Sequence, residues 1–173
     1  MTDSLSELQH EPWMRGPIPG VESLVMPVFF SFQQVREDLA RHTVDLSNGQ
    51  VWHRVGSLPP LGFHLRHIAG SVERLTAYLM NESLTAAQLT FLKDEATPGA
   101  TLGELLTDID RSFAASEARL RTIDPASIHQ PRYIGRKRLP TTVLGLLVHI
   151  AEHTQRHLGQ AITTAKLARE LAR

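Results

Sequence analysis

The stretch VHIAEHTQRHLGQ, residues 148–160, carries three histidines at four-residue intervals, His149, His153 and His157. One turn of an α-helix takes about 3.6 residues, so side chains four positions apart lie on the same face of a helix. Steps of three or four residues join Val143, Leu146, Ile150, His153, His157 and Ala161. This spacing predicts a long amphipathic helix with two imidazoles in its otherwise small or apolar row, while His149 lies in the neighbouring row.

Three other segments show helical spacing. Together with the histidine-rich helix, they give four expected helices, near residues 27–43, 61–80, 101–122 and 141–171. Pro27 suits the first turn of the first helix, and Thr101 with Glu104 forms a T-x-x-E capping box at the third. A shorter helical piece is expected from Thr85. No segment alternates apolar and polar residues over the length of a strand, so the sequence predicts an all-α four-helix bundle with a long connection between helices three and four.

The size of the chain suits one domain. Its 173 residues, of which 42% are hydrophobic, are enough for a single core, and we expect residues 1–173 to form one domain. We expect residues 1–25 to form an irregular N-terminal lead-in before the first helix, because they contain RGPIPG and show no sustained periodicity. The expected core residues are Phe32, Leu65, Ile68, Val72, Leu105, Phe113, Leu147 and Leu158.

Composition excludes several classes of function. The chain has no cysteine, so disulfides, thiolate–metal sites and cysteine nucleophiles are excluded. Eighteen basic residues balance eighteen acidic ones, which argues against a nucleic-acid binder. The polar N-terminus lacks the apolar segment of a signal peptide, and LGLLVHI, residues 144–150, is too short to span a bilayer. We therefore expect a cytoplasmic protein with no membrane partner.

A second group of histidines lies on the helix expected at residues 61–80. In FHLRHIAGS, residues 63–71, His64 and His67 flank the apolar stripe. Facing helices of a bundle commonly supply metal ligands from both sides, and a pair of histidines on one helix needs a third donor from elsewhere. The alternative is that these histidines lie on a helix surface or shoulder without metal, and the spacing alone leaves both possibilities open.

Two segments together resemble the DinB-like superfamily of damage-inducible and thiol-transferase-like proteins. They are GFHLRHIAGSVERL, residues 62–75, and LPTTVLGLLVHIAEHTQRHLGQA, residues 139–161. The resemblance implies a four-helix bundle that holds a divalent metal through one histidine of the second helix and an H-x-x-x-H pair of the fourth. By position these ligands are His67, His153 and His157. The metal would be zinc, nickel or iron, since imidazole suits each of them.

The resemblance also implies an activity. Three neutral imidazoles leave coordination positions open, as in catalytic metal sites. Relatives in this superfamily include metal-dependent S-transferases and isomerases that use low-molecular-weight thiols, so a thiol and an electrophile are the expected small-molecule substrates. A homodimer is implied as well. The alternatives are a non-catalytic metal-binding or stress-response module, and a helical interaction protein whose histidines only stabilise the fold.

Two further features are the basic loop before the fourth helix and a glutamate beside the histidine row. The basic loop of Arg132, Arg136, Lys137 and Arg138 leads into the fourth helix, where it either grips an anionic substrate or is a solvated run of charge. Glu152 is expected to face away from the row of His153 and His157, which excludes it as a general base.

Overall fold

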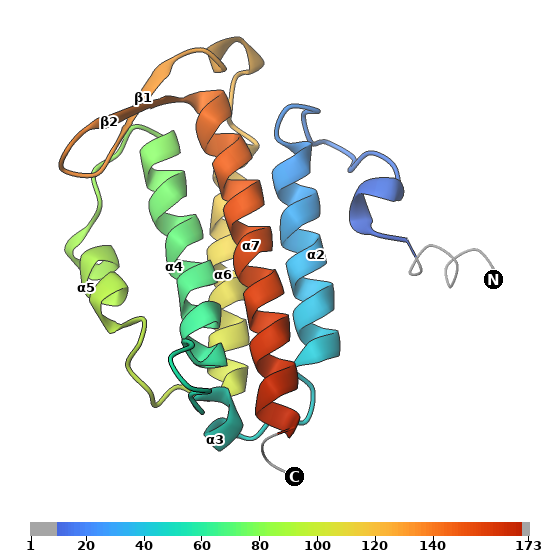
Figure 1. Ribbon diagram of the computed structural model, residues 1–173. Coiled ribbons are helices and arrows are strands. Elements are labelled where there is room, and N and C mark those ends of the chain that lie inside the picture. The colour runs from blue at the N-terminus through green and yellow to red at the C-terminus, as the bar shows by residue number, and fades with distance from the viewer. Residues whose placement is uncertain (1–9, 171–173) are drawn as a thin grey trace.

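Helices make up most of the computed structural model, which describes residues 10–170. The four long helices among these residues are α2 (Met26–His42), α4 (Leu61–Leu79), α6 (Leu102–Leu120) and α7 (Val143–Glu170). Figure 1 shows them side by side, with α4 and α7 in front of α6. Their bounds agree within two residues with the helices expected from the sequence. The end expected at residue 171, like residues 1–9 of the lead-in, lies outside the described residues.

The expectation of no strands was wrong. Two short strands, β1 (Pro131–Ile134) and β2 (Leu139–Thr142), pair antiparallel in the connection before α7. Each strand has only four residues, which is too few for alternation to be recognised in the sequence. Two positive φ angles, 66° at Gly135 and 48° at Arg138, form the turn between them.

Reciprocal caps begin several of the helices. The expected capping box of Thr101 and Glu104 begins α6, and a second box formed by Thr85 and Gln88 begins α5 (Ala86–Asp94). A third begins α3 (Asn48–Val51), which the sequence reading missed because the helix is a single turn. In the described part of the lead-in there is only one short 3-10 helix, η1 (Pro12–Met14). Another, η2 (Pro125–Ser127), follows α6.

The core lies between the long helices. α4 packs against both α6 and α7, and α7 packs against α2 as well. The stacked rings of Phe32 and Phe113, whose centroids are 4.1 Å apart, join α2 to α6. All eight residues expected in the core are buried, at 3% exposure or less. Among the helices of residues 10–170, none combines the length and apolar character that crossing a membrane requires.

One close approach at the start of α4 generates a prediction. A Cβ added at Gly62 would lie 2.7 Å from the Trp52 ring, whose Nε1 donates a hydrogen bond of 2.7 Å to the Ala100 carbonyl. Because this bond holds the indole in place, Gly62→Ala should lower the free energy of unfolding by about 1–3 kcal/mol. Gly103, the second residue of α6 as Gly62 is of α4, faces open space. Gly103→Ala should therefore raise that free energy by about 0.5–1 kcal/mol. Urea denaturation measures both, and equal effects would contradict the steric argument.

Candidate metal centre

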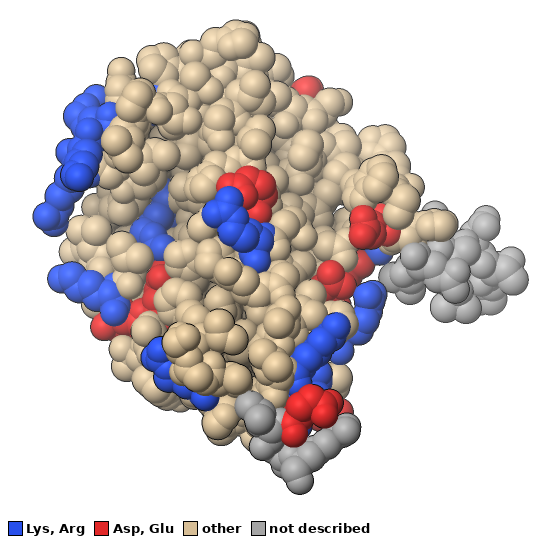
Figure 2. All heavy atoms as spheres, viewed as in Figure 1, with Lys and Arg blue, Asp and Glu red and all other residues tan. Residues whose placement is uncertain are grey.

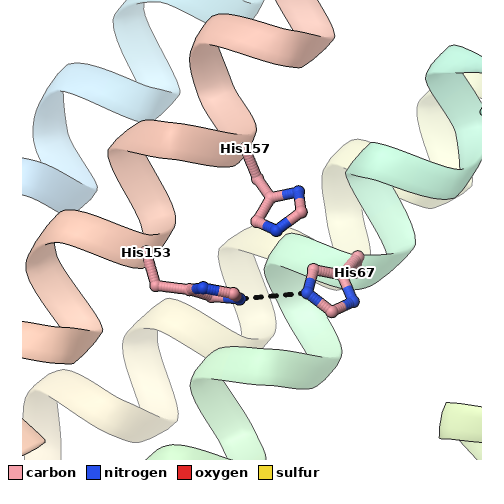
Figure 3. A group of neighbouring side chains, drawn as sticks. All are labelled: His67, His153 and His157. Atoms are coloured by element: carbon pink, nitrogen blue, oxygen red, sulfur yellow. Dashed lines mark hydrogen bonds between the residues drawn. The ribbon is translucent and has the colours of Figure 1, made fainter.

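The three histidines implied as ligands by the resemblance lie together in the structure. His67 comes from α4, and His153 and His157 come from successive turns of α7. One ring nitrogen from each lies within 4.8 Å of the others. Figure 3 shows the three rings pointing toward a common point between the two helices. Residues 86 positions apart thus meet because α4 packs directly against α7.

The distances between the rings suit a shared ion. Nε2 of His67 lies 3.0 Å from Nε2 of His153 (Figure 3). The centroid of the His157 ring is 4.2 Å from that of His67 and 4.6 Å from that of His153. Two nitrogens that bind one zinc ion tetrahedrally, each at about 2.1 Å, lie roughly 3.4 Å apart. The group therefore needs only a small adjustment to hold an ion.

Glu95 orients His67 from the opposite side of its ring. Its Oε2 lies 2.7 Å from Nδ1 of His67, and Arg74 lies 2.8 Å from its Oε1 in an ion pair. Burial raises the pKa of Glu95, but His67 and Arg74 together more than offset this, and the pKa lies below its usual value. An ionised Glu95 accepts a hydrogen bond from the protonated Nδ1 of His67, so Nε2 carries a lone pair that faces the other histidines.

Sequence reasoning missed Glu95. This residue follows α5 and lies 28 positions after His67 along the chain. It stands in KDEAT, residues 93–97, among other charged residues and at no spacing typical of a metal motif. The signal appears only in three dimensions, where the side chain of Glu95 is 5% exposed although it carries charge. A carboxylate buried this deeply has to be paired, and both of its partners lie on α4.

His153 and His157 are suited to bind metal because they resist protonation. Burial, and next the nearby His67, lower the pKa of each to about 4. Their Nδ1 atoms are enclosed and have no hydrogen-bond partner among the described residues. His67 carries its proton on Nδ1. A cation between the rings would therefore receive one nitrogen lone pair from each of the three histidines. The donor set and its neutral state therefore fit a divalent ion.

His149 and Glu152 form a second group at the edge of the row, and this group shares His153 with the first. Nδ1 of His149 lies 2.7 Å from Glu152, and Arg156 pairs with the same carboxylate at 2.5 Å. A Glu152 oxygen also lies within 4.8 Å of ring nitrogens of His149 and His153. The carboxylate is therefore nearer the row than expected, because His149 draws it in. It lies outside the group of His67, His153 and His157.

Two cavities flank the three histidines along the seam between α4 and α7. The larger, about 490 Å³, is lined by Phe63, His64, His157 and Gly159, among others. The smaller, about 200 Å³, is lined by His67, Ser71, Tyr78 and His153 on the other side. A ligand can therefore approach the histidines from both directions. His64 itself is 4% exposed, and its ring centroid is 5.8 Å from that of His157, so it stands beside the group rather than in it.

The basic loop lies away from the histidines. Nε of Arg132 donates a hydrogen bond of 2.6 Å to the Leu79 carbonyl at the end of α4, and Arg138 stacks 4.4 Å above the Tyr133 ring. Leu79 follows His67 by twelve residues of continuous helix, which corresponds to about 18 Å. The structure therefore gives Arg132 a role in closing α4 and does not support contact with a ligand at the histidines.

Comparison with known proteins identifies one family. A model of the DinB superfamily matches residues 31–161, a range that includes His67, His153 and His157. No curated protein matches the chain.

The low pKa values generate a prediction for the metal-free protein. His64, His153 and His157 take up protons near pH 6.5 when unfolded but only near pH 4 when folded. Acid in this window therefore favours the unfolded state, and stability falls as pH decreases from 6.5. Thermal denaturation in EDTA should give a Tm on the order of 5 °C lower at pH 5 than at pH 7.

The control for this measurement replaces the same three histidines by glutamine. That variant should show a much smaller change in Tm between pH 7 and pH 5, because carboxyl groups titrate mainly below this range. An equal change in the variant and the unchanged protein would contradict the assignment of these low pKa values.

Proposed function

Because the chain belongs to the DinB superfamily, we propose that it is a divalent-metal-dependent enzyme whose ion is held by His67, His153 and His157. The observation that carries the proposal is the convergence of three ring nitrogens from α4 and α7, with Glu95 orienting one of them. In this proposal the four long helices form a four-helix bundle, and residues 1–173 form one domain. The metal is zinc, nickel or iron.

The chain's own residues prepare the site for an ion with open positions. Glu95 keeps the proton of His67 on Nδ1, and burial keeps His153 and His157 neutral, so the histidines bring no negative charge. A divalent ion bound in this way would supply a Lewis acid that lowers the pKa of a coordinated water or thiol. The cavities on either side of the histidines leave room for ligands at the open positions.

The proposed reaction is transfer of a low-molecular-weight thiol to an electrophile, or an isomerisation that uses such a thiol. Its support is family membership together with the two cavities, which offer separate space for two small molecules. Turnover assays of the zinc-, nickel- and iron-loaded protein with panels of thiols and electrophiles test this step.

A non-catalytic metal-binding or stress-response module is the second candidate. The acids nearest the histidines, Glu95 and Glu152, each pair already with an arginine. This observation favours the second candidate, because neither carboxylate is set up to take a proton from a substrate. Metal binding without turnover in the assays above would support it.

The metal site generates a direct prediction. Replacing His67, His153 or His157 by alanine should remove most of the bound metal, because two imidazoles hold a divalent ion poorly. The same change at His149 or His64 should leave the metal content largely intact. Elemental analysis of zinc-loaded, desalted protein measures this. Full occupancy in the His67→Ala protein would show that the site does not bridge the two helices.

Glu95 provides a second prediction. Glu95→Gln should weaken zinc binding by about tenfold or more, since outer carboxylates that orient ligating histidines typically contribute 10–100-fold. Glu117→Gln is the matched control, because that carboxylate pairs with Arg36, belongs to neither group of candidate ligands, and should change affinity little. Competition with a fluorescent zinc chelator measures both affinities. Unchanged affinity in Glu95→Gln, in protein that is folded by circular dichroism, would contradict the role of Glu95.

We also propose that the chain forms a homodimer. The support is a groove between α2 and α7 lined by Trp13, Phe30 and Val148, of which Trp13 is 61% and Val148 58% exposed. Val148→Asp should then favour the monomer. Light scattering tests this, and a mass near 19.3 kDa for the unchanged protein would contradict a dimer.

A further inference from the structure

The larger cavity beside His157 is a mostly neutral chamber with one cation at its edge. Leu58, Pro59 and Phe63 line it on the side of α4, and Gln160, Thr163 and Thr164 on the side of α7. Arg156 is the only Lys, Arg, Asp or Glu among its lining residues. Figure 2 shows that most of the surface over α4 and α7 likewise carries neither basic nor acidic side chains. Leu58, Pro59 and Phe63 make one wall of the chamber apolar, so a ligand that packs against this wall has an apolar body.

His64 is a buried polar group in this cavity that lacks a partner. The residue is 4% exposed, its Nδ1 is enclosed, and neither ring nitrogen has a hydrogen-bond partner among residues 10–170. Buried polar atoms in folded proteins are almost always paired. Nε2 is the ring nitrogen that is not enclosed, so it can pair with a molecule in the cavity.

Gly159 lies at the rim of the cavity on the side of α7, where it is exposed. A Cβ added there would have nothing within 4 Å, although the residue sits inside a helix, where glycine is unfavourable. The position therefore accepts a large side chain at the rim without disturbing the packing of the helices.

Arg156 determines the charge of the ligand. One of its terminal nitrogens pairs with Glu152, and its side chain is 56% exposed at the mouth of the cavity. A guanidinium has five N–H donors, so an arginine that binds one carboxylate oxygen can still bind another anion. An anionic group such as a carboxylate fits this position.

We propose that this cavity binds a small molecule with an apolar body, a carboxylate that pairs with Arg156, and a second polar group that bonds to Nε2 of His64. The inference rests on the proposed function, since it places this molecule next to the ion held by His157. It assigns His64 and Arg156 as residues that determine which substrate binds.

The test uses 4-hydroxyphenylacetate as the probe and zinc-free full-length protein. Titration followed by two-dimensional ¹H–¹⁵N NMR should show saturable shifts at the amides of Gly159 and Thr163. Gly159→Leu should weaken binding at least about tenfold by narrowing the rim of the cavity. Gly103→Leu is the matched control, since Gly103 also lies in a helix and faces open space, and it should leave binding unchanged.

Two further variants separate the two polar contacts. Arg156→Gln should weaken binding of 4-hydroxyphenylacetate about fivefold, as expected for an exposed ion pair, and leave the neutral 4-hydroxyphenylacetamide unaffected. His64→Phe should weaken binding of 4-hydroxyphenylacetate but not of phenylacetate, which lacks the hydroxyl. Absence of shifts at Gly159, or equal binding by Gly159→Leu and the unchanged protein, would overturn the proposal.

Zinc binding measured on the same proteins distinguishes this inference from the proposed function. If the unchanged protein binds zinc but the probe leaves Gly159 unaffected, the inference fails and the metal site stands. If the probe binds in the cavity and zinc does not bind, the metal site fails instead, and the cavity is a carboxylate site without an ion.

Discussion

The packing of α4 against α7 is the interaction on which the rest of the site depends. It sets His67 of one helix opposite His153 and His157 of the other, at a separation that only direct contact between the helices allows. Both helices contribute buried leucine and isoleucine side chains to one core cluster, among them Leu65, Ile68 and Ile150. The apolar contacts stabilise the pair of helices, and the histidines occupy the part of the seam that those contacts leave open.

A charged imidazolium is unfavourable in such a buried seam, and the protein avoids this charge in two ways. His153 and His157 remain neutral, because burial and the neighbouring His67 lower their pKa values. His67 instead bonds to an ionised carboxylate, and Arg74 balances the charge of that carboxylate from the same helix as His67. The result is a site in which three lone pairs can face one point while the surrounding charges are already compensated.

Periodicity and capping boxes were enough to predict the long helices, because amphipathic helices of this length repeat their pattern many times. They did not decide which histidines converge: His67, His153 and His157 were assigned by position from the resemblance to the DinB-like superfamily. Glu95 could not be found in this way, since its relation to His67 depends on how the chain after α5 returns to α4. The hairpin of β1 and β2 and the single turn of α3 were missed because each is too short to repeat a pattern.

The same seam separates the proposed metal site from the proposed ligand cavity. Successive turns of α4 carry His64 and then His67, and α7 runs antiparallel to α4. His157 therefore stands between the group proposed to bind an ion and the cavity next to His64. Only His157 belongs to both. Residues such as Gly159 and Arg156 line the cavity without belonging to the group of three histidines. The shape and charge of the cavity can therefore change, by substitution at these positions, while the histidines and Glu95 remain the same. This arrangement would let one metal site serve different small molecules, because the side chains proposed to select a ligand, His64 and Arg156, are not among the three histidines proposed to hold the ion.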